Sequence, residues 1–271
     1  MTNNEPVRNV VLNADPSAVG LPAKLAASET SAVFSVSCKA LQEADLANLP
    51  PIEGEEQHIH MSIKNRTDAE QREACHRRLT TMCISDLAKG IRASMEKAAA
   101  HIDFSRTNME TLARPTEKEV LVAANAKLLE FTAEAQKLRY PALLAKVQAG
   151  LTSELDWVPE LISFQRLRNC LEHRGGKVGE RDLDDNGVLS LQLPYMEVGL
   201  TRDDGELDPL PVGKRLERDR VVGTRVRVRQ QSFSAGEAIV FPPHRVREIA
   251  FSVWLFADDL VSKLIANSDE D

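Results

Sequence analysis

The chain has 271 residues, 42% of them hydrophobic, and a formal net charge of −7. This composition supplies a sizeable core and fits one large domain, or one domain with an appendage. Because the chain is acidic and has no apolar run near the roughly 20 residues of a membrane helix, we exclude a membrane protein and a protein that coats nucleic acid with its whole surface.

The start of the chain and the cysteines bear on the compartment. The first ten residues, MTNNEPVRNV, lack the basic-then-apolar order of a signal peptide. The four cysteines form no C-x-x-C pair and are expected to be reduced and buried. We therefore expect a cytoplasmic protein with no membrane partner.

The N-terminal 66 residues differ in pattern from the rest. Residues 1–30 are small and polar, which is typical of a disordered start. Two segments, SAVFSVSCKAL (31–41) and QHIHMSIKNR (57–66), alternate short apolar and polar residues and predict strands. Residues 1–66 are thus interpreted as a partly disordered, β-containing segment, followed by a helical domain over 67–271.

Four long helices are predicted in that domain. Apolar residues recur every three to five positions over 67–103, 115–148, 156–173 and 241–266. Pro141 is expected to kink or end the second helix. Short connections favour antiparallel neighbours, so the prediction is a mainly α fold built as an antiparallel four-helix bundle.

A β insertion is predicted between the third and fourth helices, at about 188–243. The segments 188–198, 220–233 and 237–241 have the composition of strands and are separated by turn-forming residues. Arg225, Arg227 and Arg229 alternate with valines, so a strand would place their three guanidinium groups on one face. This face is either a solvated, charge-guarded surface or a ridge that follows the phosphates of RNA.

The end of the third helix holds the candidate catalytic residues, in the stretch FQRLRNCLEHRGGKVG (164–179). Asn169 and His173 are one turn apart, and Arg168 lies obliquely on the same side. A guanidinium can bind phosphate and an imidazole can move protons near neutral pH, while an amide can orient either. These residue types suffice to cleave a phosphodiester without metal.

The same residues also fit an ordinary helix end. In that interpretation His173 interacts favourably with the helix dipole, Asn169 is exposed, and Arg168 forms an ion pair with Glu172. The residue types alone leave both interpretations open.

The stretch LRNCLEHRGGKV closely resembles the signature of HEPN domains (higher eukaryote and prokaryote nucleotide-binding). That signature is an arginine, a polar residue that is often asparagine, three variable positions and a histidine, at the end of a long helix in an α-helical bundle. Arg168, Asn169 and His173 occupy these positions. The resemblance covers roughly residues 67–265, although only the short motif is specific.

The resemblance implies a metal-independent endoribonuclease that cleaves RNA by attack of the ribose 2′-hydroxyl. Family members often form homodimers in which two motifs face each other, and many serve in toxin–antitoxin pairs or phage defence. We therefore expect RNA, a second copy and an antitoxin or other protein as partners, with no cofactor and no metal. The alternative is a non-catalytic module that dimerises or binds a protein or nucleotide. The residues expected to guide RNA are Arg166, Arg174, Lys177, Arg225, Arg227 and Arg229.

Overall fold

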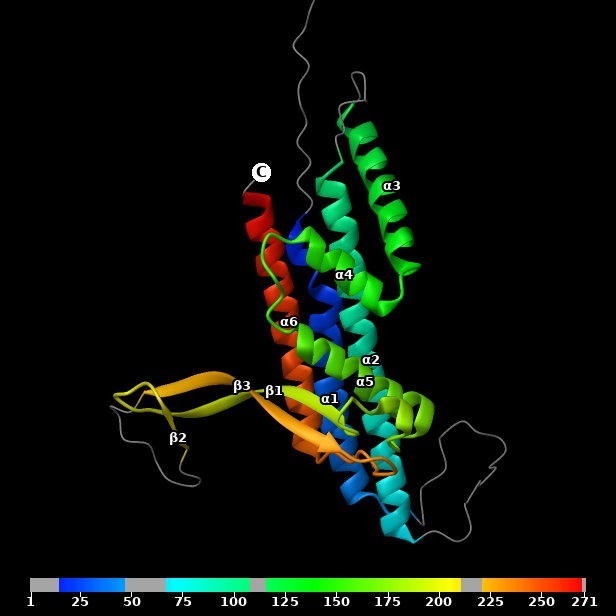
Figure 1. Ribbon diagram of the computed structural model, residues 1–271, viewed down its shortest axis with the longest axis vertical. Coiled ribbons are helices and arrows are strands. Elements are labelled where there is room, and N and C mark those ends of the chain that lie inside the picture. Colours follow the sequence, from blue (N-terminus) through cyan, green and yellow to red (C-terminus); the bar gives the residue numbers. More distant parts are fainter. Residues whose placement is uncertain (1–14, 47–66, 108–115, 211–220, 270–271) are drawn as a thin grey trace, which may run out of the picture. The chain divides into compact units, whose positions relative to one another are not determined.

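The computed structural model describes residues 15–46, 67–107, 116–210 and 221–269. These residues are mainly helical and include one small antiparallel sheet, as predicted (Figure 1). None of the described helices is long and apolar enough to cross a membrane. The α-helices are α1 (Leu21–Glu43), α2 (Asp68–Ser105), α3 (Glu117–Gln136), α4 (Tyr140–Gly150), α5 (Val158–Arg174) and α6 (Pro243–Asp269); the strands are β1 (Leu189–Thr201), β2 (Leu207–Pro209) and β3 (Val222–Phe233).

The prediction of a strand over 31–41 is wrong, because this segment belongs to α1. The residues that α1 buries, among them Thr30, Phe34 and Cys38, recur every three or four positions, which is the period of a helix. The strand was predicted from short apolar/polar alternation and β-branched residues, but Val33 and Val36 are both exposed. The second predicted strand, 57–66, lies outside the described residues.

The helix predicted over 67–103 is confirmed as α2, which packs closely against the start of α1. A Cβ atom added at Gly90 would lie 2.5 Å from the Ala26 Cβ, so only glycine allows this approach. The Ser94 hydroxyl accepts a hydrogen bond of 3.1 Å from the Ala23 backbone N–H. This bond satisfies one of the N–H groups that the first turn of α1 leaves without a helical partner.

The helix predicted over 115–148 is two helices, α3 and α4. Thr116 and Glu119 form a capping box that starts α3. Pro141 lies in the first turn of α4, where its missing N–H costs nothing, and residues 137–139 separate the helices. Pro141 therefore ends the periodic segment.

The insertion forms a three-stranded sheet with the order β2-β1-β3 and antiparallel pairing throughout. The predicted strand 237–241 is wrong, since only Ala238 forms an isolated bridge, to Lys177. The proximal part of the sheet is joined to α5, where the Ser163 hydroxyl accepts a 2.6 Å hydrogen bond from the Gln192 N–H. The distal part, residues 194–210 and 221–229, extends away from the helices beside it and is called the arm here (Figure 1).

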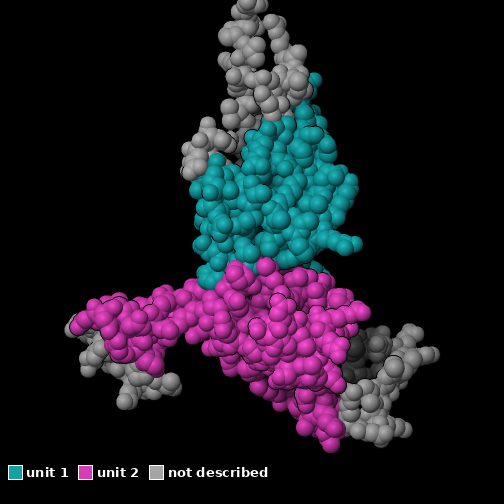
Figure 2. Space-filling view, viewed as in Figure 1, with its two compact units in different colours: residues 1–26, 89–158, 253–271 teal, residues 27–88, 159–252 magenta. Residues whose placement is uncertain are grey.

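The chain divides into two compact units, coloured separately in Figure 2. Unit 1 comprises residues 1–26, 89–158 and 253–271, and unit 2 comprises residues 27–88 and 159–252. Helices α1, α2 and α6 contribute residues to both units. The predicted boundary at residue 66 falls at the end of the segment 47–66, which is not described.

Unit 1 contains a buried imidazole that should make its stability depend on pH. Burial lowers the pKa of His101 below its ordinary value of 6.5, and the Asp15 carboxylate only partly opposes this shift. The unfolded chain therefore binds the proton more readily, and stability falls as the pH drops through 6.5 towards the lower pKa of the folded state. We expect the melting temperature to fall by a few degrees between pH 8 and pH 5.5. His101→Gln should flatten this dependence, whereas His244→Gln, which changes an exposed residue, should retain it. Equal slopes in the two variants would contradict the assignment.

Candidate functional site

Helix α5 carries the predicted catalytic residues, and its packing fixes their directions. Leu161, Phe164, Leu167 and Leu171 are buried at spacings of three and four, so one stripe of α5 faces the core of unit 2. Each residue advances the helix by about 100°. The direction of every other α5 side chain follows from this stripe.

Two glycines end α5 directly after the motif, as the sequence indicates. Gly175 and Gly176 have φ angles of 59° and 79°, a left-handed conformation that side chains disfavour. The Gly176 N–H donates a 3.1 Å hydrogen bond to the Cys170 carbonyl, which satisfies one of the last carbonyls of the helix. His173 therefore lies in the last turn of the helix.

His173 and Asn169 share the solvent-facing side of α5. His173 is exposed and forms no hydrogen bond or ion pair with any described residue. Asn169, one turn earlier, is half-buried, and its side-chain oxygen accepts a 3.2 Å hydrogen bond from the Gln165 amide. Arg166 lies two turns before His173 on the same side and is also exposed. This side of α5 thus presents an imidazole, an amide and a guanidinium to solvent.

Arg168 points elsewhere, to the edge of the buried stripe. Five residues separate it from His173, which corresponds to about 140° around the helix. The Arg168 guanidinium forms an ion pair with Glu172, one turn further on. Its Nε is buried without a hydrogen-bond partner. No hydrogen bond joins Arg168 to His173 in the described chain, so the structure does not bring this pair together.

A groove of about 550 Å³ lies beside the Arg168–Glu172 pair, between α2 and the end of α5. Its wall on α2 adds Arg77 and Arg78, which precede the first residue of the motif, Arg168, by about 90 residues. Arg77 is paired with Glu73 at 2.8 Å, and Arg78 is exposed. Arg78 could not be predicted from the sequence, because no sequence pattern links this part of α2 to α5. The groove is lined by Glu70, Glu73, Ala74, Arg77, Arg78, Thr81, Leu171, Glu172 and Gly175.

The basic residues around the end of α5 differ in whether a carboxylate already pairs with them. Arg174 forms an ion pair with Asp182, a buried carboxylate that also accepts a 2.9 Å hydrogen bond from the Gly179 N–H. Arg174 therefore holds the loop that follows α5, and this role competes with the predicted contact to RNA. Lys177 and Arg166 are exposed, and Asp184 interacts electrostatically with Arg166.

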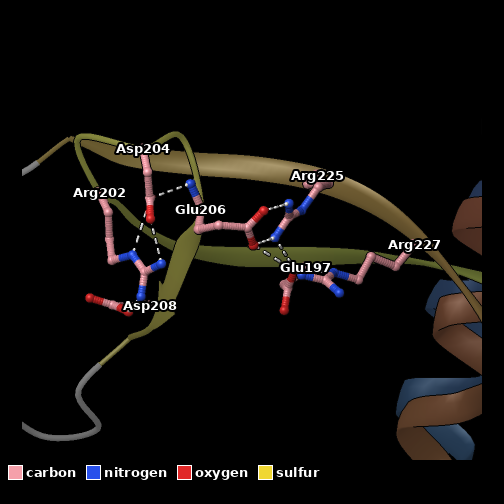
Figure 3. A network of polar contacts seen from close by, with 7 residues as sticks. All are labelled: Glu197, Arg202, Asp204, Glu206, Asp208, Arg225 and Arg227. Atoms are coloured by element: carbon pink, nitrogen blue, oxygen red, sulfur yellow. Dashed lines mark hydrogen bonds and ion pairs between the residues drawn. The ribbon is translucent and has the colours of Figure 1, made fainter.

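The three arginines of β3 lie on one face, as predicted, but carboxylates already bind them (Figure 3). Arg225 pairs with Glu206 at 2.8 Å, and Arg227 pairs with Glu197 at 2.6 Å. Hydrogen bonding to Glu206 raises the pKa of Arg225, and the same contact lowers the pKa of Glu206.

Arg229 is engaged as well, since it pairs with Glu248 at 3.1 Å and lies 4.3 Å from the centre of the Tyr195 ring. The network of Figure 3 also includes Arg202, Asp204 and Asp208. It therefore contains four carboxylates and three guanidinium groups. This face has no excess of positive charge, which weakens its assignment as a ridge that binds phosphates.

Comparisons with known proteins identify no relative of this chain. No family model, curated protein or solved structure matches the chain. Among the described residues, no group of three or more histidine, cysteine or acidic side chains is placed to hold a metal ion. The site is therefore argued from its own residues.

Glu172 should weaken the binding of phosphates to this site, because it occupies Arg168 and adds negative charge to the groove. We expect Glu172→Gln to bind a short single-stranded RNA about three- to tenfold more tightly, from the loss of an ion pair worth up to about 1 kcal/mol and of a repulsive charge. Fluorescence anisotropy at low salt measures this change. The control is Glu130→Gln on α3, which removes a similar pair, with Lys127, and should leave the affinity unchanged. Weaker binding by Glu172→Gln would contradict the assignment.

Proposed function

We propose that the chain is a metal-independent endoribonuclease of the HEPN type. The observation that carries this proposal is the exposed His173, which no described residue engages and which shares one side of α5 with Asn169 and Arg166. A histidine recruited only for structure would be expected to have a partner, whereas a catalytic imidazole must be accessible to its substrate. The four-helix HEPN-like bundle belongs to this proposal too.

The chemistry requires two proton transfers and stabilisation of one growing charge. A general base removes the proton of the ribose 2′-hydroxyl, whose oxygen attacks phosphorus while the bond to the 5′-oxygen breaks. A general acid protonates that leaving oxygen, which gives a 2′,3′-cyclic phosphate and a 5′-hydroxyl. His173 can serve as this acid, because its imidazole is exposed and accessible to the substrate. A guanidinium stabilises the charge on the phosphate oxygens, so the step needs no metal.

Arg168 must reach the phosphate from a direction different from that of His173. The separation of about 140° on one helix keeps both groups of one chain from converging through helix geometry alone. We assign the catalytic pair to two copies of the chain, with Arg168 of one copy and His173 of the other acting on one phosphodiester. Arg168 would then exchange Glu172 for the phosphate, while Asn169 orients the histidine.

Arg166, Lys177 and Arg78 are the exposed cations best placed to hold the RNA on either side of the cleaved bond. A toxin–antitoxin or phage-defence role in the cytoplasm remains part of the proposal.

One observation favours the second candidate function, a non-catalytic module that binds a partner or a nucleotide. Arg168 pairs with Glu172, and Asn169 pairs with Gln165, within a single chain. Such pairs are expected where a motif stabilises its own helix. This function predicts that Arg168→Ala and His173→Ala lower the melting temperature and that no RNA is cleaved.

The test is incubation of the purified protein with mixed RNA in EDTA. We expect cleavage by the wild type and a rate at least about 100-fold lower for His173→Ala, the usual contribution of a general acid or base. Arg168→Ala should lose a similar amount of activity. His244→Ala, which changes an exposed histidine of α6, is the matched control and should cleave normally. Absence of cleavage by the wild type, or equal rates for wild type and His173→Ala, would overturn the proposal.

A further inference from the structure

The apolar side chains of the sheet change faces halfway along its two long strands. In the proximal half of β1, Leu189, Leu191 and Leu193 are buried on one face. From Pro194 onward the aliphatic residues are Met196 and Val198, which alternation places on the opposite face. The phase of the pattern therefore shifts by one residue at Pro194.

The apolar side chains of β3 change faces as those of β1 do, while the pairing register stays unbroken. Phe233 is buried opposite Leu189, whereas Val226 lies opposite Met196 and Val228 opposite Pro194. The result is a face on the arm that is aliphatic apart from Thr224, which lies opposite Val198, and in which the residues of both strands are cross-strand neighbours. Five of its side chains are 36–48% exposed: Met196, Val198, Val222, Val226 and Val228. The face is completed by Pro194 and Leu200.

The other face of the arm is satisfied within the chain. It carries the network of Figure 3, in which Glu197 and Glu206 bind Arg225 and Arg227. Charges paired in this way remain favourable in water and need no further partner. If both faces of the arm were exposed to water, polar side chains would be expected on both. The exposed aliphatic face is therefore the surface that we expect a partner to bury.

The edges of the arm are protected against the addition of another strand. Strand β2 pairs with Gly199–Thr201 of β1. Pro194 has no N–H to donate to a further strand. Strand β3 is an edge strand of the sheet, and it carries charged side chains such as Arg225 and Arg227. A partner should therefore pack on the aliphatic face and not along an edge.

We propose that a second copy of this chain covers the aliphatic face, so that two arms pack face to face as a small β-sandwich. The face carries no charged side chain, and the network behind it is internally paired, so two identical faces meet without repulsion. Flat aliphatic two-stranded faces are suited to sheet-on-sheet packing. The arms are the dimerisation element of the protein, whether or not it cleaves RNA.

The size of the face sets the strength of the dimer. It spans seven residue pairs, from Pro194 opposite Val228 to Leu200 opposite Val222. Strand rise and spacing make it roughly 23 Å by 10 Å, which places the contact among small interfaces. We expect a reversible dimer with a dissociation constant on the order of micromolar.

Sedimentation velocity of the full chain, from about 1 to about 200 µM, tests this inference. The wild type should shift from monomer to dimer over this range. Val226→Glu places a charge in the centre of the contact and should remain monomeric throughout. Val226→Thr keeps the shape and the β propensity and should weaken the dimer about tenfold. Arg227→Gln, the next residue on the opposite face, should dimerise like the wild type.

Far-UV circular dichroism establishes that each variant is folded. If Val226→Glu loses its sheet, the test depends on whether Val226→Thr weakens the dimer. A wild type that stays monomeric at the highest concentration overturns the inference. A dimer that both Val226 variants form as tightly as the wild type also overturns it. A monomeric wild type would also contradict the two-copy site, whereas a dimer that forms through another surface would leave that site open; cleavage by His173→Ala is measured separately and tests the nuclease proposal.

Discussion

The burial of one stripe of α5 is the constraint on which the account depends. Leu167 and Leu171 are held in the core of unit 2 and fix how the helix is rotated. That rotation directs His173 to solvent and leaves Arg168 at the edge of the buried stripe, paired with Glu172, which lines the groove. The arginine and the histidine of the motif are close in sequence but act in different directions. A site that needs both on one phosphate must either break the ion pair and bend a long side chain around the helix, or draw the second group from another copy.

The arm gives a physical reason why a second copy should be present. Along its two strands the apolar side chains change from the face that is buried in the proximal half to the opposite face, where five of them are 36–48% exposed. The pairing register is unbroken, so the change lies in the sequence, where Leu193 and Pro194 are successive apolar residues on opposite faces. The ion-paired network keeps the remaining face hydrated. The same arginines that suggested an RNA-binding ridge are paired with carboxylates, and they form the hydrated face of the arm that we propose as the dimer contact.

The sequence predicts the elements with long, regular apolar periods and misses what depends on contacts between distant segments. Helices α2, α5 and α6 follow directly from their stripes, and Gly175 and Gly176 mark the end of α5. The strand predicted over 31–41 is wrong because short alternation and β-branched residues also occur in this helix, whose buried residues are spaced by three and four.

The motif and its exposed histidine could be located from the sequence, and so could the Arg168–Glu172 pair, from its i, i+4 spacing. Arg78 could not, and neither could the carboxylates that bind the β3 arginines, because Glu197 and Glu206 reach them only through the strand register.

The most direct test of the two-copy site mixes Arg168→Ala and His173→Ala, each inactive alone. Random exchange leaves half of the dimers mixed, each with one intact site, so the account predicts roughly a quarter of the wild-type cleavage rate at concentrations where the dimer forms. A mixture as inactive as either variant alone would contradict it.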